Sequence, residues 1–175
     1  MIAATGPHCN AASSTEEAFD RLVEAYQLPL LRMCRAYLRD AALAEDAVQE
    51  TFLKAYKALP RFRGESSEKT WLMRIAVNTC KDISRSAWLR HTDRRRPPED
   101  MPLASPPPND EAEALARAIA RLPRKYKAVI LLYYYQDMGQ EEVAQALKVT
   151  ASTVSRRLAR ARDMLRDALE GGIDT

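Results

Sequence analysis

Proline is concentrated in one stretch of this chain, and that limits what the rest can fold into. Six of the ten prolines fall between Pro97 and Pro108, and the 175 residues include only five glycines. Proline interrupts helices and central strands, because it has no backbone N–H to donate. The remaining sequence is poor in turn-forming residues, which favours helices over many short strands. We therefore predict an all-α protein of two small helical domains joined by a flexible, proline-rich linker.

The spacing of apolar residues predicts where these parts begin and end. We expect a disordered tail over 1–15, a first domain over 16–89, the linker over 90–110 and a second domain over 111–170. Helical spacing in the first domain predicts three helices, at 16–39, at 43–59 and from a Pro/Gly/Ser loop to about Trp88. Pro29 should kink or divide the first of these helices. The linker should let the two domains sit apart.

The end of the second domain carries the most specific local pattern. A short helix ends at Pro123, and an apolar helix follows over 126–135. Two further helices, at 140–147 and 151–169, flank a three-residue turn, and their apolar stripes predict a helix-turn-helix: Val143, Ala144 and Leu147, then Val154, Leu158, Ala161 and Leu165. Many such turns have glycine at the position of Lys148, where φ is often positive, so we expect mild strain there.

Charge is distributed unevenly along the chain. Residues 61–96 hold ten Lys/Arg against four Asp/Glu, and residues 148–167 hold six against two. Residues 16–50 are acidic, with eight Asp/Glu against four Lys/Arg, and 99–113 hold five Asp/Glu and no Lys or Arg. Two basic blocks indicate two surfaces for polyanions. Solvated helix faces would explain the same charges.

Three exposed faces stand out against this background. The second helix should expose Leu53 within an acidic and amide patch. The third helix should expose a basic, hydrogen-bonding face made of Thr70, Arg74, Asn78, Lys81 and Arg85. The last helix has short residues near its start and arginines further along, which is the composition that entry into the DNA major groove requires.

Other classes of function find little support. The cysteines, Cys9, Cys34 and Cys80, are far apart, and no Cys/His cluster suggests a metal site. Cys34 and Cys80 should be core thiols of a protein in the reducing cytoplasm. No apolar run approaches the roughly twenty residues of a membrane span. No nucleophile–base set or phosphate-cradling glycine loop is present, so we expect no catalysis, cofactor or metal.

Three stretches, in this order, resemble the extracytoplasmic-function sigma factors, small promoter-recognition subunits of bacterial RNA polymerase. Residues 46–56 are similar to the family's core-binding helix, 62–64 and 70–79 to its reader of the −10 element, and 153–162 to its reader of the −35 element. The frequent glycine of the last stretch is Ser152 here, and its frequent basic residue and serine are Ser155 and Arg156. The resemblance therefore does not tell which promoter sequence this chain prefers.

The resemblance implies a role for each matched residue. Core polymerase would be bound by Asp46, Gln49, Glu50 and Leu53. The −10 element would be bound by Phe62, Arg63, Ser66, Thr70, Arg74, Asn78, Lys81 and Arg85, with Asn78 and Phe62 lining a pocket for a flipped base. The −35 element would be bound by Ser152, Thr153, Ser155, Arg156, Arg157, Ala159 and Arg160.

The resemblance also implies partners. They are core RNA polymerase, promoter DNA and an inhibitory anti-sigma factor, for a chain that is cytoplasmic, is not inserted in the membrane and is a monomer when free. Two other functions fit the residues. One is a free-standing helix-turn-helix repressor or activator, and the other is an adaptor that binds polymerase without reading DNA.

Overall fold

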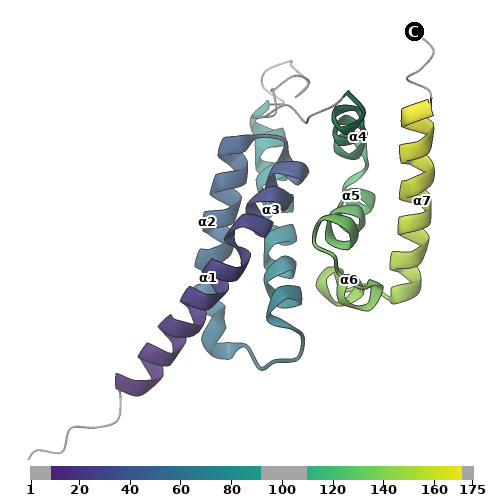
Figure 1. Ribbon diagram of the computed structural model, residues 1–175. Coiled ribbons are helices and arrows are strands. Elements are labelled where there is room, and N and C mark those ends of the chain that lie inside the picture. The colour runs from purple at the N-terminus through teal and green to yellow at the C-terminus, as the bar shows by residue number, and fades with distance from the viewer. Residues whose placement is uncertain (1–8, 92–109, 171–175) are drawn as a thin grey trace, which may run out of the picture.

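The computed structural model describes residues 9–91 and 110–170, with side chains over 15–87 and 111–170. Within these ranges all regular secondary structure is helical (Figure 1). The first domain consists of α1 (Cys9–Leu38), α2 (Ala41–Ala58), the 3-10 turn η1 (Leu59–Arg61) and α3 (Glu68–His91). The second consists of α4 (Asp110–Arg121), α5 (Arg124–Ile130), the π-helical turn η2 (Leu131–Tyr135), α6 (Gln140–Leu147) and α7 (Ala151–Glu170). The fold class is as predicted, and most of the predicted linker, 92–109, lies outside the described residues.

The first helix differs from its prediction at both its start and its proline. It begins at Cys9 rather than Glu16, so residues 9–15 are helical and not part of a disordered tail; residues 1–8 are outside the described ranges. It continues through Pro29 to Leu38, so Pro29 does not divide the helix, which was one of the two effects expected of this proline. A proline inside a helix costs about 3 kcal/mol. Here the packing of α1 against α2 and α3 outweighs that cost.

The three helices of the first domain bury a shared apolar core. Its largest fully buried side chains are Leu22, Leu30, Met33, Leu72 and Met73. Cys34 and Cys80 are buried as predicted, and their sulfurs lie within hydrogen-bond distance of each other, 3.6 Å apart. The hydrogen bond between the two thiols and their burial raise the pKa of the Cys34 thiol.

Side-chain caps fix where the helices of the first domain begin. The carboxylate of Asp40 accepts a hydrogen bond from Leu43 N at 2.8 Å, so α2 starts at Ala41, just after it. Ser67 precedes α3, and its hydroxyl accepts from Thr70 N at 3.1 Å. These caps set the direction of α2 and α3, and with it the faces that they expose.

The helix-turn-helix forms as predicted. Val143, Val154 and Ala161 are fully buried, and Leu158 is 1% exposed. Lys148 ends α6 with φ 54° and ψ 50°, the left-handed conformation expected at the usual glycine position. Val149 N donates to Ala144 O at 3.0 Å across the turn. The predicted single helix over 126–135 is instead the short α5 followed by the π-helical turn, where Gln136 N donates to Leu131 O at 3.1 Å.

The two domains pack against each other, contrary to the expectation that they sit apart. Helix α3 contacts α6, and α1 contacts both α4 and η2. The side-chain amide of Gln136 donates to Pro29 O at 2.9 Å, and the ammonium of Lys127 lies 5.6 Å from the centre of the Tyr37 ring. Gln136 is 4% exposed, so this polar contact is buried in the seam. Apolar residues of both domains form one continuous core.

Candidate polymerase and DNA interfaces

All four residues expected to bind polymerase lie on one exposed ridge of α2. Asp46, Gln49, Glu50 and Leu53 line a groove between α2 and α3, opposite Asp82, Ile83 and Ser86. The Leu53 side chain is 47% exposed, which confirms the prediction of an exposed leucine in a polar patch. Lys54 borders the groove and bonds Glu50 and Thr79, at 3.4 Å and 3.2 Å.

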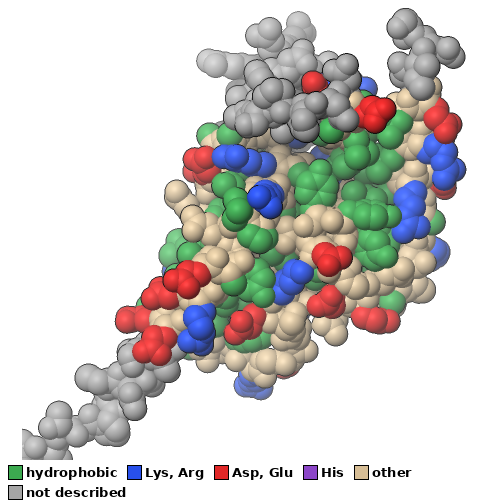
Figure 2. Space-filling view, viewed as in Figure 1, with side chains coloured by type: hydrophobic (Ala, Val, Ile, Leu, Met, Phe, Trp, Pro, Cys, Tyr) green, Lys and Arg blue, Asp and Glu red, His purple; other side chains and the backbone are tan. Residues whose placement is uncertain are grey.

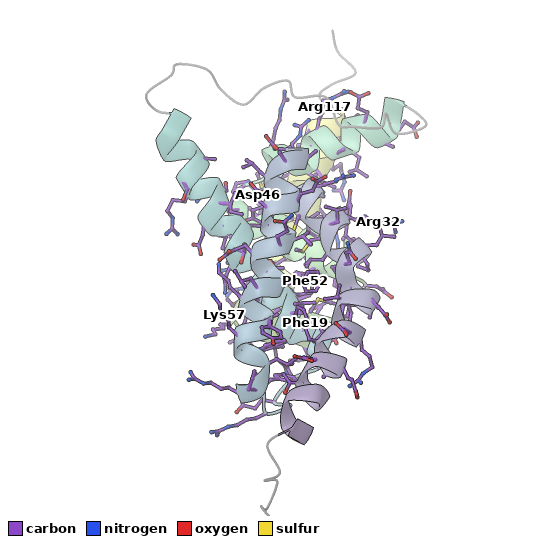
Figure 3. All side chains as sticks on the ribbon, turned by 90° about the vertical axis from the view of Figure 1, so that its left-hand side faces the viewer. Phe19, Arg32, Asp46, Phe52, Lys57 and Arg117 are labelled. Carbon is purple, nitrogen blue, oxygen red and sulfur yellow. The ribbon has the colours of Figure 1, made fainter. Side chains whose placement is uncertain are left out.

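A second groove, which the sequence analysis missed, lies on the other side of this ridge, between α1 and α2. Its walls are apolar: Phe19, Val23, Val48, Phe52, Leu53 and Tyr56. Figure 3 shows Phe19 and Phe52 side by side between the two helices, with ring centres 6.1 Å apart. The ring of Tyr56, which is 43% exposed, lies 5.0 Å from that of Phe19. The helical spacing of Phe19 with Val23, and of Leu53 with Tyr56, could have indicated it.

The acidic N-terminal half of α1 borders this groove. Figure 2 shows its carboxylates gathered toward the N-terminal end of the helix, and the exposed ones are Glu16, Glu17, Asp20 and Glu24. The α2 ridge adds Asp46 and Glu50, which are also exposed. The surface around Leu53 is therefore an apolar centre with an acidic rim, a composition suited to a basic, amphipathic partner.

The loop between α2 and α3 holds the first of the predicted −10 residues. Arg63 is exposed, and Phe62 and Ser66 are half-buried. The Phe62 ring packs on Trp71 with ring centres 4.8 Å apart, so α3 anchors this end of the loop. Gly64 has φ +71°, a conformation that disfavours any other residue.

Thr70 does not belong to the exposed face on which the sequence analysis placed it. Its side chain is fully buried, and its hydroxyl accepts a hydrogen bond from Ser67 Oγ at 2.9 Å. Thr70 lies in the first turn of α3, where it pairs with the capping serine instead of pointing outward. Its structural role is to hold the start of the helix.

The remaining residues of the α3 face differ in exposure. Asn78 and Arg85 are exposed, whereas Arg74 and Lys81 are half-buried. Arg74 Nε is buried and has no hydrogen-bond partner among the described residues. Burial lowers the pKa of Lys81, and the positive charge of Arg157 lowers it further. Because Arg157 lies on α7, part of the predicted −10 face meets the second domain.

The predicted −35 residues on α7 form an open surface. Ser152, Ser155, Arg156, Ala159 and Arg160 are all exposed. Thr153 is half-buried, and Thr150 Oγ1 accepts from its backbone N–H at 3.3 Å, which caps the helix. Arg157 is half-buried on the side that faces Lys81. Short side chains at the start of α7 and arginines beyond them leave the backbone accessible to a groove.

A contact between α7 and η2 was not predicted. Arg162 Nε donates to the hydroxyl of Tyr134 at 3.0 Å, although both side chains are exposed. The contact holds Arg162 beside the predicted −35 surface. Its residues are far apart in sequence, and only the fold brings them together.

Neither a metal site nor a membrane span is found in the described residues. No group of three or more His, Cys, Asp or Glu side chains could hold a metal ion there. Over the same ranges, no helix has the length and apolar character needed to cross a membrane.

The fold and its exposed faces define a helical protein with a helix-turn-helix at its C-terminal end, and comparison with known proteins gives its family. Residues 22–91 match the family model described as Sigma-70 region 2, and residues 112–165 match Sigma-70, region 4. The chain is 34% identical to the RNA polymerase sigma-H factor of Pseudomonas aeruginosa, over 89% of this chain and 88% of that one. It is 33% identical to the ECF RNA polymerase sigma-E factor of Haemophilus influenzae, over 89% of each.

Two solved structures share the arrangement. CnrH, in complex with the cytosolic domain of CnrY, matches with a TM-score of 0.71 and 27% identity over 94% of each chain. RpoE of Bartonella quintana, in complex with the anti-sigma factor NepR, matches with a TM-score of 0.76 at 21% identity, over 91% of this chain and 99% of that one. The second likeness supports the fold alone. The chain belongs to the sigma-70 family of RNA polymerase sigma factors, in its extracytoplasmic-function group.

Proposed function

We propose that this sigma factor divides transcription initiation among three surfaces. The ridge from Asp46 to Leu53 binds core RNA polymerase, the 62–67 loop and the outer face of α3 bind the −10 element, and the outer face of α7 binds the −35 element. The corresponding domains span 16–89 and 111–170, and residues 90–110 connect them. The observation that carries the proposal is the open serine–arginine face of α7 within a complete helix-turn-helix.

The physical sequence of events follows from what each surface can bind. The second domain docks on duplex DNA, because short side chains let the α7 backbone approach and Arg156 and Arg160 reach base edges and phosphates. The first domain captures a base as the strands part. Asn78 offers an amide to the base edge, and the ring of Phe62 offers an apolar wall. Phosphates beside the base are held by Arg74, Lys81 and Arg85.

Strand opening in this scheme is driven by binding free energy alone. Base capture is favourable only once the base is unstacked, so it shifts the equilibrium toward open DNA. The protein acts as a binding factor rather than an enzyme, and it works in the cytoplasm, where promoter DNA is found.

Simultaneous use of both DNA-reading surfaces requires the two domains to separate. Arg157 of α7 approaches Lys81 of α3, so the two readers partly cover each other. Two surfaces that bind different elements of a promoter cannot remain in contact while each is occupied. The packed and open arrangements of the two domains are then in equilibrium. A partner shifts that equilibrium only if it binds one arrangement more tightly than the other, so polymerase must bind the open arrangement more tightly.

An anti-sigma factor is the expected inhibitory partner. Both structural neighbours were solved in complexes, one with the cytosolic domain of CnrY and the other with an anti-sigma factor. The apolar, acid-rimmed surface around Leu53 is open in the free monomer. A partner that covers this surface would exclude polymerase.

Run-off transcription with purified core polymerase and a library of genomic fragments tests the proposal. Initiation at defined start sites that depends on both proteins is expected. Tight, specific DNA binding without polymerase would instead identify a free-standing repressor or activator. Polymerase binding without initiation would identify an adaptor.

A further inference from the structure

The seam between the domains gathers three cations that lie outside every surface discussed above. Arg39 follows the last turn of α1, and Arg124 and Lys127 lie on α5. Among the described residues, none of the ion pairs involves any of the three. Arg39 and Lys127 are half-buried, whereas Arg124 is exposed. Half-buried charges in proteins are normally paired with an opposite charge, because removal from water is costly. We call Arg39, Arg124 and Lys127 the seam cations.

Lys127 is the innermost of the seam cations. Its ammonium lies 5.6 Å from the centre of the Tyr37 ring, and Tyr37 is only 4% exposed. Burial lowers the pKa of Lys127 to about 8, and the charges of Arg39 and Arg124 contribute. Arg124 lies one turn before Lys127 on α5, and Arg39 follows Tyr37 by two residues, so positive groups from both domains lie near the contact between Lys127 and Tyr37.

A buried polar atom lies beneath the seam cations. The hydroxyl of Tyr37 is inaccessible to solvent and has no hydrogen-bond partner among the described residues. Burial raises the pKa of this hydroxyl to about 12, while the charge of Arg124 acts in the opposite direction, so Arg124 lies near it. The seam thus contains positive charges and a tyrosine hydroxyl that makes no hydrogen bond. Among the described residues, no carboxylate forms an ion pair with the seam cations.

We propose that the seam cations bind a small oxyanion of the phosphate class, and that the bound anion holds the two domains together. Guanidinium groups match the geometry of tetrahedral oxyanions, and an ammonium adds a compact charge. Three cations favour a multiply charged anion over a single carboxylate. Arg39 belongs to the first domain and Arg124 and Lys127 to the second, so an anion that contacts all three is a bridge. It favours the arrangement in which the DNA readers cover each other.

Calorimetric titration of the full chain tests the binding step, with inorganic phosphate and pyrophosphate as probes at constant ionic strength. Saturable binding of one anion per chain is expected, tighter for pyrophosphate. Lys127→Gln and Arg39→Gln should each weaken it roughly tenfold or more, because each removes a charge-assisted hydrogen bond. Lys125→Gln is the matched control, since Lys125 is an exposed lysine on the same helix. It should leave the affinity unchanged.

Small-angle scattering tests the bridging step. Phosphate should make the wild-type chain more compact and should leave the Lys127→Gln chain unchanged. Circular dichroism establishes that both chains are folded. Arg39→Gln provides an independent variant in the other domain if Lys127→Gln fails this check.

Three outcomes would overturn the proposal. The first is the absence of saturable binding, and the second is equal weakening by Lys125→Gln, which would indicate general attraction to a basic surface. The third is a pair of results: the wild type binds no free phosphate, and Lys127→Gln loses binding to a DNA duplex that contains no promoter. That result would assign the seam cations to the DNA backbone.

Discussion

The two surfaces predicted to read DNA are built from similar residues but differ in accessibility. On α7, Ser152, Ser155, Arg156, Ala159 and Arg160 are all exposed. On α3, Asn78 and Arg85 are exposed, Arg74 and Lys81 are half-buried, and Thr70 is buried. The difference arises because α3 packs on α6, whereas only Thr153 and Arg157 of the predicted −35 residues are half-buried, Arg157 on the side that faces Lys81. Accessibility thus depends on tertiary packing as well as on composition.

This comparison suggests an order of events. The α7 surface can meet duplex DNA in the packed arrangement, while the α3 surface becomes fully available only when the domains separate.

The largest effect is expected for Asn78→Ala. Loss of the amide should weaken capture of the flipped base by about 2–4 kcal/mol if it makes two hydrogen bonds, because both groups on the base are left unpaired. Permanganate footprinting on a duplex promoter should show reduced strand opening, while polymerase binding and protection of the −35 element stay at wild-type levels. Unchanged strand opening on a fully duplex promoter would contradict the role given to Asn78.

Arg160→Ala should impair binding to the −35 element and leave strand opening intact. It should weaken binding of the −35 element by roughly 1–3 kcal/mol if Arg160 contacts a base. Footprinting with titrated holoenzyme measures this loss, and opening of a premelted template should be unaffected. Arg166→Ala is a suitable control, since Arg166 is exposed on the same helix outside the predicted site. An identical footprint for Arg160→Ala would place this residue on the solvated face.

Packing of the domains should depend on pH through Lys127. In the packed arrangement its pKa is lowered from 10.5 to about 8 by burial and by Arg39 and Arg124. Between these values the packed arrangement binds fewer protons than one in which Lys127 is free, so raising the pH from 8 to 9.5 favours packing, by at most about tenfold per pH unit. Tyr37 stays protonated in this window, because its pKa is raised to about 12.

Scattering profiles recorded across the same pH window measure this dependence. The chain should become more compact as the pH rises, and Lys127→Gln should reduce the trend to the part that Lys81 contributes, since burial and Arg157 also lower the pKa of Lys81. An unchanged trend in Lys127→Gln would mean that another group controls the packing.

The smallest effect is expected at the turn of the helix-turn-helix. Lys148→Gly should raise the free energy of unfolding by about 0.5–1 kcal/mol, because glycine adopts φ 54° without the strain of a side chain. Thermal unfolding measures the change, and DNA affinity should stay the same because the exposed face of α7 is untouched. A lower melting temperature would show that Lys148 makes a favourable contact that outweighs the strain.

Much of the fold could be predicted from local patterns. The α6 bounds, the left-handed Lys148 and the buried stripe of Val154, Leu158 and Ala161 all follow from helical periodicity and turn chemistry. Pro29 does not divide α1, because propensity measures a local cost and the packing of a 30-residue helix outweighs it. Thr70 was misplaced, because its pairing with Ser67 depends on where the helix begins.

The candidate sites were predictable to the extent that they lie on one helix. The ridge from Asp46 to Leu53 is a pattern within α2, so periodicity alone places its residues on the same side. The apolar groove of Phe19 and Tyr56 is formed by two helices, and the seam cations by two domains. Helical spacing could indicate the apolar residues on each wall of the groove, but not that the two walls meet, and it could not indicate the seam, because local spacing does not encode which helices meet.

Local patterns therefore suffice to predict two helical domains, the place of the proline-rich connection, and most of the residues on each exposed face. Tertiary packing alone brings the two domains together, covers part of α3, and places Lys127 beside Tyr37. The physical reason is that periodicity and turn chemistry act over a few residues, whereas burial depends on which surfaces meet. The proposed oxyanion site depends entirely on which surfaces meet.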